Sequence, residues 1–115
     1  MSPTRLTQSA QRRTHATALA ALGDETRLTL LNHLAAGKQA SISQLTTGSR
    51  LTRQAITKHL RVMEAARLVR CTRQGRETLF ELDPRPIMEL GKYLTLVSQQ
   101  WDQALLRLKA FVEEQ

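Results

Sequence analysis

The sequence predicts a mainly α-helical domain of the α+β class with one small β-hairpin, because three patterns follow one another along the chain. Residues 43–66 contain a short helix, a turn at Gly48 and a second helix. Residues 68–82 contain two strand-like segments that are separated by Gln74 and Gly75. Residues 84–113 repeat apolar side chains every three or four positions, which is typical of a long amphipathic helix. Together these patterns predict a winged helix-turn-helix, with the hairpin at residues 68–82 as the wing.

The chain length predicts a single domain. With 115 residues the chain can bury one core but is too small for two. We therefore expect one domain over residues 1–115, with four helices before the hairpin and one after it. The first helix is expected over residues 9–22, because Ala16, Leu19, Ala20 and Leu22 share a face and Gly23 follows them.

A second helix is expected directly after Gly23. Asp24 can cap it, because a short carboxylate accepts hydrogen bonds from the first helical turn. Gly37 stands where a left-handed residue ends many helices. The apolar stripe of this helix is expected to consist of Leu28, Leu30, Leu31 and Leu34.

The helix-turn-helix is predicted to begin with Ser43 as the cap of a short helix over residues 44–47. Leu51 then fills the angle after the Gly48 turn, and Thr52 caps a helix that continues to about residue 66. One face of that helix is apolar and contains Ala55, Ile56, Leu60 and Met63. The other face is polar and contains Arg53, Gln54, Thr57, Lys58 and Arg61.

The last helix is expected to start with Asp83 as its cap and Pro84 at its first position, where the missing N–H costs nothing. Pro86 still lies in the first turn. An apolar stripe this long and regular predicts a partner helix. It consists of Ile87, Leu90, Leu94, Val97, Trp101, Ala104, Leu108 and Phe111.

Positive charge is concentrated in the middle of the chain. Residues 50–76 carry eight Arg or Lys and one acid, a net +7, which equals the formal charge of the whole protein. Such a focused charge indicates a nucleic-acid binder, and a merely basic soluble surface is the plain alternative. Aromatic side chains make up only 3% of the chain, so a stacking platform for single strands or RNA is absent. Duplex DNA is the better predicted partner.

The polar face of the 52–66 helix is the predicted DNA reader. Arg53 and Gln54 lie at its start and are candidates to contact base edges, since Arg pairs with guanine and Gln with adenine in two-point contacts. The remaining positions suit phosphate or base-edge contacts. His59 has two open interpretations, a phosphate contact or a buried hydrogen bond. The full predicted DNA-binding set is Thr52, Arg53, Gln54, Thr57, Lys58, His59, Arg61, Arg73 and Arg76.

Further features of the sequence argue against a disulfide-bonded protein, a membrane protein and an enzyme. Cys71 is the single cysteine, so no intramolecular disulfide is possible, and a reducing, cytoplasmic location is expected. No apolar run approaches the roughly 18 residues that a membrane span needs. No catalytic motif or phosphate-cradling glycine loop is present, so we do not expect an enzyme or a cofactor.

Three segments carry a family resemblance: ALGDETRLTLLNHL, ISQLTTGSRLTRQAITKHLRVMEAARLV and RQGRETLFELDP. In this order they resemble the ArsR-type winged helix-turn-helix repressors of prokaryotes, from about residue 14 onward. The RQAITKHL run, the DPRP sequence and Trp101-Asp102 resemble the branch often encoded beside genes for START-like (SRPBCC) domain proteins. The resemblance implies a homodimer that is joined by the first and last helices, residues 9–22 and 84–113, and that binds an inverted repeat. The implied interface is Leu19, Ile87, Leu90, Leu94, Val97, Trp101, Leu105 and Leu108.

Metal chemistry is not expected to carry over from that family. Metal-sensing members have a Cys-x-Cys near the third helix or Asp and His pairs on the last helix. Here residues 42–47 contain no thiol, and residues 84–115 contain no His. The three His and Cys71 are too scattered to predict a zinc site.

Several functions stay open at the level of sequence. The main prediction is a repressor specific for a DNA operator, with an unknown small-molecule effector as a possible further partner. A general basic nucleic-acid binder or adaptor is one alternative, and a regulator with a vestigial helix-turn-helix is another. Cys71 is expected to be a small packed side chain, with a redox-responsive repressor as its alternative role.

Overall fold

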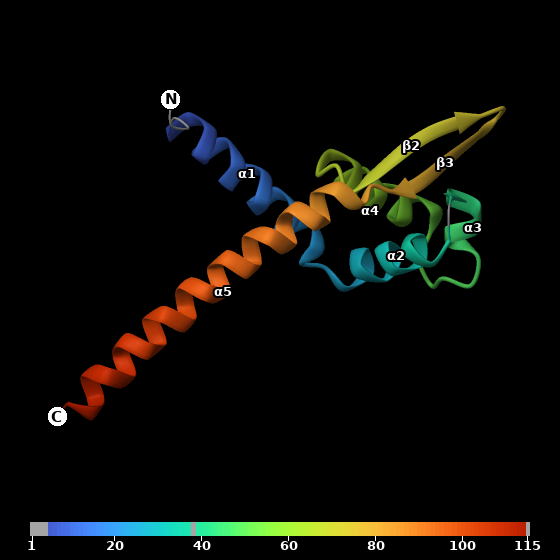
Figure 1. Cartoon of the computed structure of the whole chain (residues 1–115). Coiled ribbons are helices and arrows are strands. Elements are labelled where there is room, and N and C mark those ends of the chain that lie inside the picture. Colours follow the sequence, from blue (N-terminus) through green and yellow to red (C-terminus); the bar gives the residue numbers. More distant parts are fainter. Residues whose placement is uncertain (1–4, 38, 115) are drawn as a thin grey trace.

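A computed structural model describes residues 5–37 and 39–114, with only the backbone described for residues 5–7. Within these residues the structure has five helices and three strands, and Figure 1 shows how the helices and the hairpin are arranged. They are α1 (Arg5–Leu22), α2 (Glu25–Ala36), β1 (Ala40–Ser41), α3 (Ile42–Thr46), α4 (Arg53–Ala65), β2 (Val69–Gln74), β3 (Glu77–Leu82) and α5 (Pro84–Glu113). The predicted winged helix-turn-helix is confirmed. The first helix begins earlier than the expected residue 9, and the last helix spans the expected residues 84–113.

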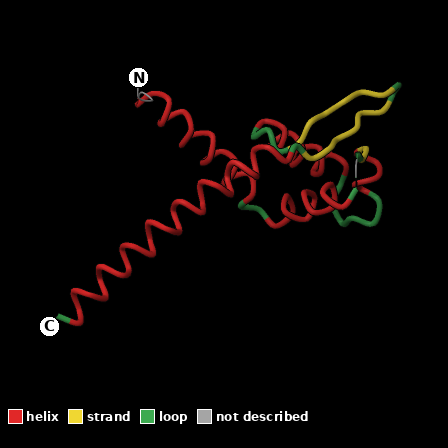
Figure 2. Tube along the Cα trace, in the orientation of Figure 1, coloured by secondary structure: helices red, strands yellow, loops and turns green. Residues whose placement is uncertain are grey.

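The sheet has three antiparallel strands in the order β1-β3-β2. Gln74 pairs with Glu77, so the two-residue loop of the wing is Gly75-Arg76, one position later than predicted. Gly75 has a φ of 62°, a conformation that favours glycine and suits a tight hairpin. The two-residue strand β1 was not predicted, and it pairs Ala40 with Phe80. In Figure 2 all strands lie at the end of the molecule opposite to the end of α5.

The core lies between α2, α4 and the sheet. Ile56, Leu60 and Met63 of α4 are buried, which confirms the predicted apolar face of that helix. Phe80 from β3 and Leu68 before β2 are also fully buried against the same cluster. Burying an aromatic ring removes a large apolar area from water, so Phe80 is a main contributor to stability.

Two predicted apolar stripes are partly wrong. In α1 the buried positions are Ala18 and Ala21, whereas Ala16 and Ala20 are exposed. In α2 Leu28 is 45% exposed, because α2 turns Leu30, Leu31 and Leu34 toward the core instead. The correct stripes follow from which neighbouring elements cover each helix, and sequence spacing alone does not contain that information.

The helix caps are mostly those expected. Asp24 accepts from the backbone of Arg27 at 3.0 Å, Thr52 accepts from Ala55 at 3.1 Å, and Asp83 accepts from Arg85 at 3.2 Å. These hydrogen bonds satisfy N–H groups that lack partners within the helix.

Two helix ends differ from prediction. Ser41, and not Ser43, caps α3, and it does so in a capping box with Gln44. Gly37 has a φ of −105°, so α2 does not end in a left-handed residue.

The fold is elongated because α5 extends beyond the packed elements (Figure 1). The radius of gyration is 19.1 Å, compared with roughly 13 Å for a compact domain of this length. Near its start α5 packs on α1, where the rings of His15 and Tyr93 stack with their centroids 4.6 Å apart. Within the described residues, none of the helices has the length and apolarity needed to cross a membrane.

Candidate nucleic-acid interface

The polar face of α4 is positioned by its buried face. Gly48, with a φ of 78°, makes the turn that follows α3, and Leu51 packs against the core as expected. With Ile56 and Leu60 turned inward, the opposite side of α4 faces solvent. Of the five predicted polar-face residues, Thr57 is half-buried, and the exposed ones are Arg53, Gln54, Lys58 and Arg61.

Arg53 is directed toward α3 and the wing. Its Nη1 donates to Ser43 Oγ at 2.7 Å, a contact between residues ten positions apart. Both residues line a hollow of about 190 Å³ together with Arg76 from the tip of the wing. The guanidinium therefore lies at one edge of the polar face, between the recognition helix and the wing.

Arg61 lies at the other edge of that face. It donates to Glu64 at 2.8 Å, and its guanidinium carbon lies 5.9 Å from the centre of the buried Phe80 ring. The hydrogen bond from Arg61 to Glu64 raises the pKa of Arg61, and a contact with Cys71 adds a smaller effect in the same direction. Arg61 thus reaches across to β2 while its charge stays partly exposed.

Gln54 and Lys58 form the centre of the polar face. Both side chains are exposed, and neither has a hydrogen-bond or ion-pair partner among the described residues. Thr57, between them, donates its hydroxyl to the backbone carbonyl of Arg53 at 2.7 Å. The groups with unused hydrogen-bonding capacity are therefore the Gln54 amide and the Lys58 ammonium.

His59 is placed away from that centre. Its Nδ1 lies 3.3 Å from Arg27 Nη1 and 3.9 Å from Asp24 Oδ2, both at the start of α2. Arg27 also donates to the carbonyl of Ala21 at 2.7 Å, so it links the end of α1 to α2 and α4. The backbone hydrogen bond from Arg27 lowers the pKa of Asp24, and the nearby Arg27 and His59 charges act in the same direction. This geometry matches the structural interpretation of His59.

Arg27 is the residue that sequence reasoning missed at this site. It contacts the middle of the recognition helix through His59, although the two residues are 32 positions apart. The only signal in the sequence is an arginine in the first turn of a helix, where cations are electrostatically disfavoured.

The wing carries its charge on an exposed hairpin. Arg73 and Arg76 are exposed, and Arg76 occupies the loop itself. Arg70 is held by Glu81 on the facing strand at 3.5 Å. Arg50, in the turn before α4, is exposed as well, and it was not in the predicted set. The basic groups thus surround α4 from the turn to the wing tip.

The residues of the predicted apolar interface differ in how far their own chain covers them. Leu90 is buried in the core of its own chain, and Ile87 packs against that core, so neither is an open contact surface. The reason is that the first turns of α5 cover α1. Val97 is half-buried. The exposed members are Leu19, Leu94, Trp101, Leu105 and Leu108.

Comparison with known proteins shows to which family this chain belongs. A family model described as a helix-turn-helix domain matches residues 22–72. The HTH-type transcriptional regulator YuzN of Bacillus subtilis (strain 168), itself uncharacterized, is 36% identical over 78 residues, which cover 63% of this chain and 85% of YuzN. An ArsR-like transcriptional regulator from Rhodococcus sp. RHA1 is 31% identical with a TM-score of 0.82, over 93% of this chain and 97% of that one. The chain belongs to the ArsR-like family. It is a DNA-binding transcriptional regulator.

A more distant relative shares the ArsR-like fold. It is a homodimeric winged helix-turn-helix DNA-binding domain from Mycobacterium bovis, a possible ArsR-family regulator, at 16% identity and a TM-score of 0.68. The two folds match over 90% of this chain and 95% of that one. At this identity the likeness concerns the fold alone.

The two places where the family resemblance would put metal ligands have other residues in this ArsR-like chain. The short helix α3 contains no thiol, and α5 contains no His. Nowhere in the described part of the chain do three His, Cys, Asp or Glu side chains gather as a metal ion would need. Cys71 is half-buried and packs against the core beside Arg61. These residues do not fit a metal centre at either place.

Proposed function

We propose that this ArsR-like regulator is a homodimeric repressor that binds an inverted-repeat operator through residues 52–66 and the wing. The observation that carries the proposal is the polar face of α4. Its central side chains, Gln54 and Lys58, lack partners among the described residues, while Arg53 and Arg61 at its edges are held by contacts. A helix whose edge residues are held by contacts and whose central polar groups lack partners can enter the major groove in a defined orientation.

The geometry supports distinct roles along that face. Gln54 lies at the exposed start of α4 and is proposed to contact a base edge, because an amide can make a two-point contact with adenine. Arg53 was expected to do the same, but its tie to Ser43 places it beside Arg76, which favours a phosphate contact. Lys58, Arg73 and Arg76 are proposed to contact phosphates. Thr52, Thr57 and Arg61 would complete the protein–DNA contact surface, and His59 would position α4.

The exposed part of α5 supports the proposed dimer. Trp101 is 68% exposed, and Leu105, Leu106 and Leu108 lie near it on the projecting part of the helix. An apolar surface of this extent marks an interaction site. The homodimeric relative from Mycobacterium bovis supports the same assignment by analogy. Two recognition helices would then read half-sites about one helical turn apart, or a multiple of it, at ~34 to 36 Å per turn.

The finer family placement is also a proposal. The resemblance of the RQAITKHL run, the DPRP sequence and Trp101-Asp102 supports the branch encoded beside START-like domain genes. In that branch no metal would be needed for release of DNA, and the protein would act in the cytoplasm. Sequencing the genes on either side of the coding sequence tests the placement.

Operator selection tests the proposed function directly. Fragments of the source genome that bind the protein would be recovered and sequenced, and their shared element would be compared with random duplex DNA by fluorescence anisotropy. A repressor should prefer the palindromic site by on the order of 10³-fold or more at physiological salt. Equal affinity for both DNAs with a steep salt dependence would instead identify a general polyanion binder. Binding to neither DNA would identify a vestigial helix-turn-helix.

A further inference from the structure

One arginine side chain joins three helices. Arg27 lies in the first turn of α2 and is half-buried, and its guanidinium reaches two other helices. On one side, Nε donates to the carbonyl of Ala21 at 2.7 Å and Nη2 donates to the carbonyl of Ala20 at 3.4 Å, both in the last turn of α1. On the other side, Nη1 lies 3.3 Å from Nδ1 of His59 in α4. A guanidinium can make these contacts together because its N–H groups point in different directions within one plane.

The surroundings of Arg27 favour this arrangement on both sides. The carbonyl of Ala21 lies at the end of α1, where carbonyls lack partners within the helix and are stabilised by a cation. His59 is half-buried, and in the neutral imidazole with its proton on Nε2, Nδ1 accepts a hydrogen bond from the guanidinium. The carboxylate of Asp24, 3.9 Å from Nδ1 of His59, partly balances the positive charge. The contacts of Arg27 are therefore complementary in hydrogen bonding and in charge.

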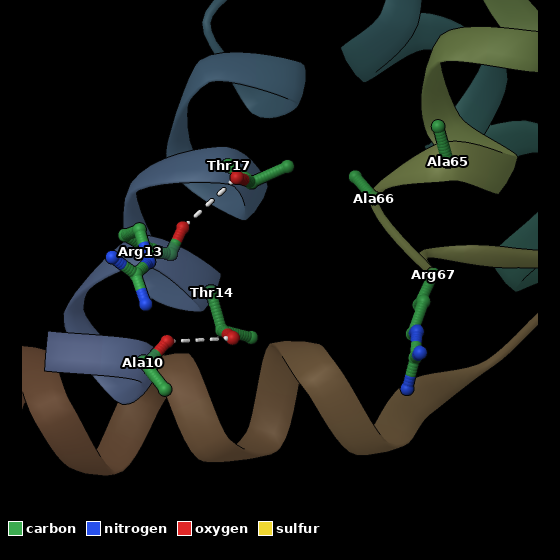
Figure 3. Close-up of a pocket in the computed structure, with 7 residues that line it drawn as sticks. All are labelled: Ala10, Arg13, Thr14, Thr17, Ala65, Ala66 and Arg67. Atoms are coloured by element: carbon green, nitrogen blue, oxygen red, sulfur yellow. Dashed lines mark hydrogen bonds between the residues drawn. The ribbon is translucent and has the colours of Figure 1, made fainter. Parts of the chain in front are cut away.

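At the far end of α4 there is no comparable link to α1. A hollow of about 400 Å³ separates the two helices there, and Figure 3 shows its lining residues approaching from both sides. The hydroxyls of Thr14 and Thr17 donate to carbonyls of α1 itself, at 3.0 and 2.9 Å, and no hydrogen bond drawn in Figure 3 crosses the hollow. Within the part of the chain that the structure describes, the hydrogen-bonded path from α1 to α4 runs through Arg27 and His59.

This path lies between the DNA-binding part of the protein and the part proposed for assembly. α5 packs mainly against α1, where the ring of His15 stacks on that of Tyr93. The projecting part of α5 is the proposed dimer contact, and α4 is the proposed recognition helix. In a dimer built this way, a rotation of α1 relative to α4 would change the separation of the two recognition helices.

We propose that Arg27 is a positioning residue that, through His59, sets the separation of the two recognition helices. The inference rests on the proposed homodimer and adds the side chain that fixes its geometry. Arg27 acts within the protein, because its guanidinium is directed at α1 and at His59. The consequence is that the operator must have one particular spacing between its half-sites.

Operators with altered spacing test this role. Inserting one base pair between the half-sites turns one of them by roughly 35° and moves it by about 3.4 Å. The wild type should bind the original operator more tightly than the inserted one by on the order of tenfold, a usual size for coupling between two sites. Arg27→Lys keeps the charge but replaces the fork by a single ammonium, so it should lower this ratio to about threefold or less. Fluorescence anisotropy measures both affinities, with a duplex that contains a single half-site as the reference.

His59→Phe tests whether Arg27 acts through the imidazole. Phenylalanine keeps an aromatic ring but lacks the acceptor, so this variant should lower the ratio as Arg27→Lys does. The double variant should have no lower ratio than either single variant, because both changes remove the same contact. Arg85→Lys is the matched control, because it removes a guanidinium fork that holds Asp83 at the start of α5. It should keep the wild-type ratio.

Urea unfolding shows which variants are folded, and His59→Phe decides alone if Arg27→Lys does not fold. The inference fails if the folded variants keep the wild-type ratio or if their effects add in the double variant. It also fails if Arg27→Lys weakens binding equally on both operators and on the single half-site, because that pattern indicates a direct DNA contact. A wild type that binds the single half-site as tightly as the operator would contradict the proposed dimer itself. A dimeric wild type that tolerates either spacing would contradict only the role of Arg27.

Discussion

The two parts of α5 continue one periodic pattern but differ in what covers their apolar side chains. In the first part, Leu90 is 3% exposed, and Ile87 and Tyr93 pack against the core. Beyond Leu94 most of the same pattern is uncovered, and Trp101 and Phe111 are 68% and 60% exposed. Apolar residues recur at the same helical spacing in both parts. This spacing predicts that one face of the helix is covered, but it does not show whether the same chain or another chain covers it. The first part belongs to the fold, and the second part is the one that we propose contacts the partner subunit.

The largest effect is expected from a substitution in the buried core. Phe80→Ala should lower the free energy of unfolding by about 3 to 5 kcal/mol, because Phe80 is fully buried among α2, α4 and the sheet. Trp101→Ala is the matched aromatic substitution on the exposed part. It should leave the stability of a monomer nearly unchanged. Urea unfolding at several protein concentrations would separate the two, and equal losses for both variants in the monomer would contradict the comparison.

The DNA-binding surface should respond differently from both parts of α5. Gln54→Ala should weaken binding to the cognate operator by about 1 to 3 kcal/mol and change binding to random DNA little. Lys58→Ala should weaken both and reduce the salt slope by about one unit. Arg53→Ala should behave like Lys58→Ala if Arg53 contacts a phosphate. Anisotropy on both DNAs measures this, and identical losses for all three variants on both DNAs would refute the division of roles.

A smaller effect is expected from metal ions. Zinc or nickel should change operator affinity by less than tenfold relative to a chelator, about 1.4 kcal/mol, because neither family metal site has its ligands here. A stoichiometric metal that weakens binding more than this would overturn the expectation. The Cys71→Ser variant under oxidant provides a separate test. An oxidant response that disappears in this variant would make the half-buried thiol a sensor.

The smallest effect concerns pH at the start of α5. Arg85 donates to both carboxylate oxygens of Asp83, at 3.1 and 2.9 Å, and lowers the pKa of Asp83 from 3.8 to about 2. Since the folded pKa lies below the unfolded value, this stabilisation is complete above 3.8 and is lost as the pH falls toward 2. The stability advantage of the wild type over Asp83→Asn should therefore shrink between pH 4 and pH 2, as measured by urea unfolding. Glu89→Gln, at an exposed ion pair with Lys92, is the control. A difference that does not vary with pH would contradict the assignment.

The sequence predicted the features that depend on local chemistry. The caps at Asp24, Thr52 and Asp83 and the turn at Gly48 were confirmed, because each follows from a residue's own backbone preferences or its reach to the next turn. The wing turn contains Gly75 as expected, but it lies one residue later than predicted. The buried face of α4 was confirmed because Ile56, Leu60 and Met63 recur at regular helical spacing over about two turns.

The sequence could not predict features that depend on distant partners. Strand β1 has two residues and exists only because β3 pairs with it. The direction of Arg53 is set by Ser43 on another helix, and that of His59 by Arg27 on α2. Leu90 and Leu94 have the same spacing, yet only Leu90 is covered by the chain itself. The roles of these residues in DNA binding and assembly stay predictions.

The most direct test of the account compares Leu94→Glu with Leu28→Glu by sedimentation velocity, with operator binding measured on the same samples. Both leucines are 45% exposed, but Leu94 begins the projecting part of α5 and Leu28 lies on α2. If the projecting part of α5 forms the dimer, the wild type and Leu28→Glu sediment as dimers of about twice 13.0 kDa and bind the operator. Leu94→Glu should sediment as a folded monomer with weakened operator binding. A folded, dimeric Leu94→Glu that binds the operator fully, or a wild type that sediments as a monomer, would contradict it.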